Sequence, residues 1–176
     1  MKLIVTNDIY LTEFRPSDLA ACLEHLNDRA IHEQTLRIPF PYTEDDFAEW
    51  MEVVNRTTRA NGQPVIFAIR DRDDALIGGL GFDDVRIGKF HRAQLGYWLA
   101  KPYWSQGIMT AVVGKACDLA LNEWQLVKIS AHVFADNPAS CRVLEKCGFV
   151  QEGYLRKHYL KDGQFRDAVL YALIRE

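Results

Sequence analysis

The stretch LGYWLAKPYWSQGIMTAVVG, Leu95 to Gly114, joins two kinds of sequence pattern. Its first residues are typical of a strand, a short loop follows, and an apolar helical pattern begins near Thr110. Gly107 lies in that loop, where it can adopt backbone angles closed to other residues. A helix start exposes unpaired N–H groups at the positive end of the helix dipole, so this junction suits a phosphate. On the glycine alone, a simple turn between strand and helix is the favoured explanation.

Composition excludes several classes of protein. The chain has 176 residues, which fits one domain over residues 1–176. Its 21 Lys and Arg against 24 Asp and Glu are scattered, which argues against nucleic acid or an anionic membrane as the main partner. No signal-type or membrane-spanning apolar run is present, which predicts a cytoplasmic protein. The four cysteines show no metal-ligand spacing, so neither a metal site nor a disulfide framework is expected.

Helical and strand patterns alternate along the first half of the chain. A strand over Tyr10–Phe14 precedes a helix from about Ser17. Thr43 and Asp46 form a capping-box pattern, and Asn61-Gly62 ends the helix that follows. Three strand-like runs come next, at residues 64–70, 75–82 and 93–100, and predict an antiparallel meander.

The second half continues with a helix, a strand, a helix and a hairpin. The alternating run at residues 128–135 predicts a strand. Asn137 suits an N-cap, with Pro138 in the first helical position and Gly148 at the end. Asp162-Gly163 joins the two last strands. The order predicts an α+β fold with a mixed, mostly antiparallel central sheet and about four flanking helices.

Two segments carry a resemblance to a known family. LGYWLAKPYWSQGIMTAVVGKACDLA and NPASCRVLEKCGFVQEGYLRKHYLKDGQFRD resemble the Gcn5-related N-acetyltransferases, in the branch of the Rim-type ribosomal-protein N-terminal acetyltransferases. The likeness extends from YLTEFRPSDLAACLEHLND to the closing DAVLYALIRE. It implies acetyl-coenzyme A as cosubstrate, a primary amine as acceptor, and direct attack of that amine on the thioester. Because edge strands in this fold often pair across subunits, a homodimer is compatible with it.

The resemblance also implies a cofactor site. The loop from Trp104 to Thr110 should cradle the pyrophosphate of acetyl-coenzyme A with backbone N–H groups. The family motif asks for Gln or Arg, then Gly, then Gly or Ala, where this chain has Trp104, Gly107 and Met109. Backbone contacts do not depend on side-chain identity, so they should survive the two departures. The loop residues implied are Trp104, Ser105, Gln106, Gly107, Ile108, Met109 and Thr110.

In the family two neighbouring strands splay apart to admit the pantetheine arm. Here they would be LGYWLA and KISAHVFA, with backbone hydrogen bonds from Trp98 and Leu99. Asn137 would reach the cofactor arm or the substrate, or would simply cap its helix, or both. Ser140 matches the branch's proposed proton donor, although it could instead bond within the first helical turn. Leu144 stands where other relatives carry an acidic tyrosine, and it cannot donate a proton.

The general base is left unassigned by the sequence. Gln94 stands where many Rim-branch sequences carry Glu, and glutamine does not accept a proton at neutral pH. Asp83, Asp84, His91 and His132 could act through water, but each also suits an ordinary turn or strand position. The chain is therefore expected to be an N-acetyltransferase or, alternatively, a catalytically weak coenzyme A binding or sensing module.

Overall fold

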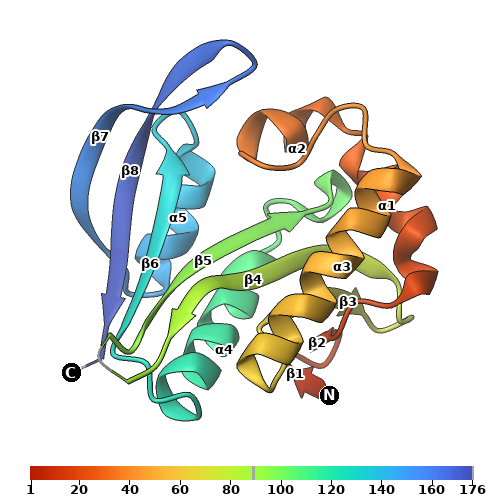
Figure 1. The fold of residues 1–176 in the computed structure, drawn as a ribbon, viewed down its shortest axis with the longest axis horizontal. Coiled ribbons are helices and arrows are strands. Elements are labelled where there is room, and N and C mark those ends of the chain that lie inside the picture. Colours follow the sequence, from red (N-terminus) through yellow and green to blue (C-terminus); the bar gives the residue numbers. More distant parts are fainter. Residues whose placement is uncertain (89, 176) are drawn as a thin grey trace. The chain divides into compact units, whose positions relative to one another are not determined.

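The computed structural model describes residues 1–88 and 90–175 and contains an eight-stranded sheet with five α-helices and two 3-10 helices (Figure 1). The sheet order is β1-β2-β3-β4-β5-β6-β8-β7. The strands are β1 (Lys2–Ile4), β2 (Ile9–Thr12), β3 (Ile66–Asp71), β4 (Leu76–Arg86), β5 (Arg92–Leu99), β6 (Lys128–Phe134), β7 (Val150–Lys161) and β8 (Gln164–Ile174). The helices are η1 (Pro16–Asp18), α1 (Leu19–Leu26), α2 (Arg29–Gln34), α3 (Glu44–Asn61), η2 (Lys101–Tyr103), α4 (Ile108–Asn122) and α5 (Pro138–Lys146).

The chain divides into two compact units, which we describe separately. The first contains residues 1–81 and 97–108, and the second contains residues 82–96 and 109–176. In the first unit, β2 pairs antiparallel with β1 and β3, and β3 pairs antiparallel with β4. Figure 1 shows α1 and α3 in orange, and the two helices contact each other. The apolar residues of β2 and β3 form a core because nearly all of them are buried.

Helix α3 begins and ends where its sequence predicts. The hydroxyl of Thr43 accepts from the N–H of Asp46, and the carboxylate of Asp46 accepts from the N–H of Thr43 at 2.8 Å. Gly62 follows the last turn with a φ of 68°, a left-handed angle that glycine adopts without strain. Phe47 and Val54 lie on the buried side of the helix. The predicted capping box and the predicted end are both confirmed.

A buried ion pair in the first unit was not predicted. The guanidinium of Arg70 on β3 donates to both carboxylate oxygens of Asp18, at 2.9 and 2.8 Å. Its Nε also donates to the hydroxyl of Thr12 at 2.7 Å. Both charged side chains are almost fully enclosed, at 2% and 4% exposed. Satisfying the charges mutually is what permits them to lie inside the core.

The second unit is built around β6. Ile129, Ala131 and Val133 are buried while the residues between them are less so, which confirms the alternation predicted for this strand. β6 pairs antiparallel with β8 over its whole length, from Lys128 to Phe134. It pairs parallel with β5 over Arg92–Gln94, and the ladder between described residues of this unit stops there. β6 therefore continues past its β5 ladder, as the predicted splaying of these strands requires.

The second unit ends in a long hairpin, drawn in blue in Figure 1. Asp162 and Gly163 form its turn with φ angles of 49° and 76°, and Lys161 pairs with Gln164 across it. Positive angles at both turn residues define the tight turn that Asp-Gly predicts. Trp124, predicted to be core, is buried and packs edge-on against Phe82 at 5.2 Å between ring centroids.

The predicted architecture is confirmed, and two details are corrected. The short helix α2 was missed, so five α-helices replace the predicted four. It is only 6 residues long and ends at Thr35, too short for an apolar repeat to show in the sequence. The first long strand ends at Thr12 rather than at Phe14. Among the described residues, no helix is long and apolar enough to cross a membrane.

Candidate functional site

Two adjacent glycines of β4 let β5 approach closely in the first unit. A Cβ atom added at Gly78 would lie 2.6 Å from the backbone oxygen of Trp98. One added at Gly79 would lie 2.6 Å from the indole Nε1 of the same residue. Real Cβ atoms do not approach other atoms this closely, so Gly78, which faces a backbone oxygen, requires glycine, whereas a side chain at Gly79 would have to displace the indole of Trp98. Strand β4 therefore holds the backbone at Trp98 and the buried Leu99 in place from one side. Both residues are predicted cofactor contacts.

Trp104 has a structural contact that the sequence did not predict. Its indole Nε1 donates to the carbonyl of Leu99 at 2.7 Å, across η2. The residue at the first position of the family motif therefore fastens the end of β5 to the loop. Trp104 remains 38% exposed.

The loop before α4 has an unusual backbone. Ser105 and Gly107 have φ angles of 61° and 77°, in the left-handed region. The side-chain amide of Gln106 donates through Nε2 to the carbonyl of Pro102 at 2.9 Å, and this hydrogen bond stabilises the loop. No described acceptor in the first unit pairs with the N–H groups of Ser105, Gln106 or Gly107. Successive amides in such conformations form a concavity that binds anions.

Helix α4 starts directly after this loop, at Ile108. Its 15 residues align enough peptide dipoles to give the start a partial positive charge. The side chain of Met109 is buried, so this position can offer a ligand only its main chain. In the second unit, the carbonyl of Thr110 accepts from the thiol of Cys147 at 3.3 Å, which joins α4 to the end of α5. The start of α4 is thus fixed in the second unit as well.

Asn137 caps α5, as predicted. Its Oδ1 accepts from the N–H of Ser140 at 3.1 Å, and its own N–H donates to the carbonyl of Phe134 at 2.9 Å. The cap uses Oδ1 alone, so Nδ2 can still donate to another group. Ser140 is half-buried in the first turn, and Leu144, one turn later, is fully buried. The roles of Asn137 towards a cofactor and of Ser140 as proton donor stay predictions.

The turn between β6 and α5 is fastened to β8 by an arginine that sequence reasoning missed. The guanidinium of Arg166 lies 3.8 Å from the ring centroid of Phe134 and pairs with Asp136, directly before Asn137. The N–H of Ala135 also donates to the carbonyl of Asp167 at 3.0 Å. Arg166 lies 30 residues from Asp136 in the chain, so no local pattern could have indicated this contact.

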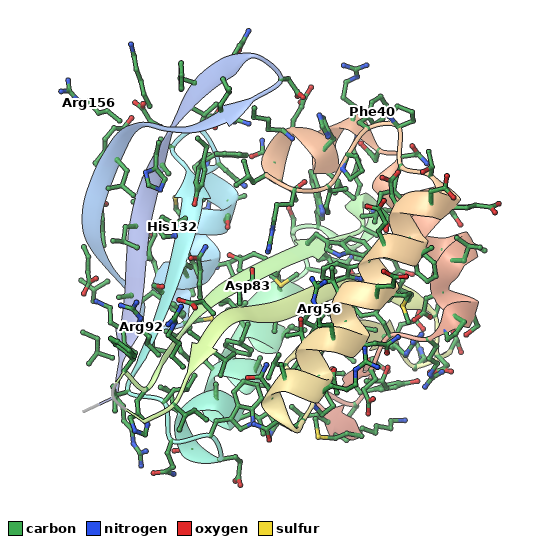
Figure 2. The ribbon with its side chains drawn as sticks, viewed as in Figure 1. Phe40, Arg56, Asp83, Arg92, His132 and Arg156 are labelled. Carbon is green, nitrogen blue, oxygen red and sulfur yellow. The ribbon has the colours of Figure 1, made fainter. Side chains whose placement is uncertain are left out.

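Three candidates for the general base differ in how they are engaged. Asp84 is exposed, has a φ of 49°, and accepts from Arg86 at 2.6 Å. His91 lies 3.2 Å from the carbonyl of Gln125 through its Nδ1. Asp84 lies in strand β4 and His91 directly before β5, and neither contact is specific to a general base. His132, labelled on β6 in Figure 2, is instead half-buried and lies next to other aromatic side chains.

Three of the four thiols are poor nucleophiles and poor metal ligands. Burial raises the pKa of Cys22 to about 12 and also raises the pKa values of Cys117 and Cys147. Because the thiolate is the reactive form, these groups are inert at neutral pH. In the parts of the chain that the structure describes, no group of three or more metal-ligating side chains comes together.

This combination of fold and loop matches a known family. The model of the acetyltransferase (GNAT) domain matches residues 8–150, so the chain belongs to this family. The [Ribosomal protein uS5]-alanine N-acetyltransferase of Escherichia coli is 33% identical over 113 residues, which cover 64% of this chain and 58% of that protein. The spermidine N(1)-acetyltransferase of Vibrio cholerae is 29% identical over 128 residues, which cover 72% of this chain and 71% of that protein.

Solved structures show the same fold. Mycobacterium smegmatis RimJ, in complex with a CoA-disulfide, superposes with a TM-score of 0.80 at 26% identity, covering 94% of this chain and 81% of that one. A ribosomal-protein-S5-alanine acetyltransferase from Vibrio fischeri gives a TM-score of 0.85 at 20% identity, covering 99% and 96%. Several curated relatives are matched over only 56 to 58% of their own length.

Proposed function

We propose that this chain transfers an acetyl group from acetyl-coenzyme A to a primary amine by direct attack of the amine on the thioester. The observation that carries the proposal is the loop before α4, where Ser105 and Gly107 take left-handed backbone angles and the loop amides lack partners within their unit. A diphosphate matches this loop because its oxygens accept hydrogen bonds and its charge favours a helix start.

The chemistry requires a neutral amine and a stabilised oxyanion. An alkylammonium group has a pKa near 10.4, so the acceptor must lose a proton before it attacks. Negative charge then develops on the carbonyl oxygen, and a fixed N–H donor stabilises it by about 3 kcal/mol in comparable acyl transfers. The N–H groups of Trp98 and Leu99 are the predicted donors. The departing thiolate has a conjugate pKa near 8.5 and needs little help, which Ser140 would supply.

The acceptor is a primary amine, and the relatives suggest two different classes of amine. One relative is named for the alanine of a ribosomal protein and another for spermidine. Both groups are cationic before reaction, and one is a protein α-amine while the other is a polyamine. A panel of acceptors should therefore include an alanine-leading peptide and spermidine.

Two measurements test the proposal. Calorimetry with acetyl-coenzyme A should give binding, and release of free thiol should depend on an amine from the panel. Binding without turnover on any amine would support the alternative, a coenzyme A binding or sensing module. That alternative is favoured by Gln94, which is paired in the β5–β6 ladder and cannot act as a base, and by the buried Leu144.

The cellular location and the oligomeric state of the protein are two further proposals. We propose a cytoplasmic location, and cell fractionation would test this. A homodimer is compatible with β7 standing at the edge of the sheet with Val150 and Tyr154 exposed. Size-exclusion chromatography with light scattering would distinguish one copy from two.

A further inference from the structure

His132 carries an unexplained polar atom in the second unit. Its Nδ1 is shut off from solvent and has no hydrogen-bond partner, the one such side-chain atom among the described residues. Buried polar atoms are nearly always paired, so an unpaired one requires an explanation. No described carboxylate lies within ion-pairing distance of the ring. His132 is therefore an imidazole in a partly apolar site without an acidic partner.

The ring stacks on a second imidazole. His132 and His158 lie nearly parallel, at 7° between planes and 5.4 Å between centroids. Tyr159 contacts both rings edge-on, at 6.1 Å from His132 and 4.5 Å from His158. His158 is exposed, whereas His132 is half-buried. The pair thus runs from the inner strand β6 to solvent at β7.

A bulge in β7 places His158 against His132. The β7–β8 register shifts between Leu155 and Tyr159, and Lys157 takes a φ of 49°. The carboxylate of Asp167 fixes this bulge because it accepts from the N–H of Lys157 at 2.7 Å and from the hydroxyl of Tyr154 at 2.8 Å. Bulges of this kind redirect side chains, often beside active sites.

The surroundings keep His132 neutral. Burial, followed by the nearby His158, lowers the pKa of His132 below its ordinary value near 6.5. Two further neighbours carry no charge at neutral pH: Leu170 pairs with His132 from β8, and Tyr159 faces it from β7. The β5 ladder ends two residues earlier, at Gln94 opposite Ser130. Because only Nδ1 is sequestered, Nε2 is the nitrogen through which a proton reaches the ring.

We propose that His132 accepts the proton that the acceptor ammonium loses before it attacks the thioester. The inference rests on the proposed function. Its strand, β6, leads directly into the turn that carries Asn137, and α5 with Ser140 follows. The ammonium N–H bond breaks, the proton joins Nε2 of His132, and the ring returns it to water. The free amine then forms the C–N bond as the C–S bond breaks, and its second proton ends on the departing thiolate.

His158 and Asp167 are positioning residues in this scheme. His158 covers one face of the His132 ring, and Asp167 holds the bulge that places it there. Without His158, the pKa of His132 should rise towards its ordinary value, since a neighbour that lowers it is gone. The acid limb of the rate profile should then move to higher pH, while the plateau rate changes little.

The test compares His132→Gln with the wild type, using acetyl-coenzyme A with spermidine and with an alanine-leading peptide. With spermidine, the wild type should show a rate plateau between about pH 7 and about pH 9, because His132 is neutral there while an alkylammonium acceptor, with a pKa near 10.4, is still protonated. His132→Gln should lose about 100-fold in kcat at neutral pH, and its rate should rise tenfold per pH unit with the fraction of free amine. Added imidazole should restore part of the rate.

Two further variants keep the test decisive. His158→Gln should shift the acid limb upward, and the matched control His91→Asn should leave the profile unchanged. If His132→Gln fails to fold, the shift in His158→Gln and an NMR titration of the wild-type His132 ring decide the matter. A ring pKa at or above 6.5, or a plateau retained in His132→Gln, would overturn the inference while the proposed function stands. Absence of turnover in the wild type with every amine would overturn both.

Discussion

Replacing Gly78 by alanine should damage the first unit and the cofactor site together. The added Cβ would lie 2.6 Å from the backbone oxygen of Trp98, and also 3.1 Å from Ile69 and 3.2 Å from Leu99. A backbone oxygen cannot rotate away, so β4 and β5 must separate where Trp98 and Leu99 offer their amides. Overpacking of this kind costs about 1 to 3 kcal/mol.

The assays are thermal unfolding, which measures Tm, and calorimetric titration with acetyl-coenzyme A. In a chain of this size, each kcal/mol lowers the Tm by about 2 to 4 °C. Gly78→Ala should therefore lower the Tm measurably and weaken acetyl-coenzyme A binding. Gly114→Ala is the matched control, because a Cβ there meets nothing within 4 Å and the residue lies inside α4. It should instead stabilise the protein by about 0.5 to 1 kcal/mol. Equal stability of the two variants would refute the reasoning.

Four other outcomes are expected. Gly107→Ala must place a side chain at a φ of 77°, which costs about 1 to 2 kcal/mol. The free loop of the variant should relax away from this angle and must return to it to bind the diphosphate, so calorimetry should show acetyl-coenzyme A affinity falling about tenfold while the fold persists; unchanged affinity would contradict this. Asn137→Ala should lose about 1 kcal/mol in urea unfolding, and Asn137→Asp should lose little, since only the aspartate keeps the cap. Arg70→Met should lower the free energy of unfolding by about 3 to 5 kcal/mol because it leaves the buried carboxylate of Asp18 without its charged partner. The double variant Arg70→Met with Asp18→Leu should recover much of that loss. No recovery would show that the charges themselves are needed. The pKa of Asp167 is lowered by the hydrogen bond from the Lys157 N–H and then by that from the Tyr154 hydroxyl. The ionised Asp167 should therefore stabilise the folded protein fully above the unfolded pKa near 3.9, and this stabilisation should disappear as the pH falls through the lower folded pKa. The difference in unfolding free energy between the wild type and Asp167→Asn measures it, and a difference that does not change with pH in that range would contradict this.

Local signals in the sequence predicted most of the fold. Three features depend only on residues a few positions apart and can therefore be predicted from the sequence. They are the capping box at Thr43, the N-cap at Asn137 and the Asp-Gly hairpin turn. The alternation in β6 likewise predicts which residues are buried. Helix α2 escaped because a helix of 6 residues cannot display a repeat.

Contacts between distant residues were not predictable. The pairs Arg70–Asp18 and Arg166–Asp136 join residues far apart in sequence, and no pattern links them. The close approach of β5 to Gly78 has a weak indication in the sequence, because ALIGGLGF contains two adjacent glycines. Their role can be interpreted only when the neighbouring strand is known. His132 was one of four equal candidates in the sequence, and only its stacking on His158 and its unpaired Nδ1 separate it from the others.

The central claim is that main-chain amides before and at the start of α4 bind the diphosphate of coenzyme A. The most direct measurement is an amide NMR titration of the protein with coenzyme A, compared with adenosine 3′,5′-bisphosphate, which lacks the diphosphate and the pantetheine arm. Coenzyme A should shift the amides of residues 105 to 110 strongly, and the bisphosphate, which keeps only one of the two phosphates of the diphosphate, should shift them less. Binding of coenzyme A with no shift at residues 105 to 110 would contradict the claim.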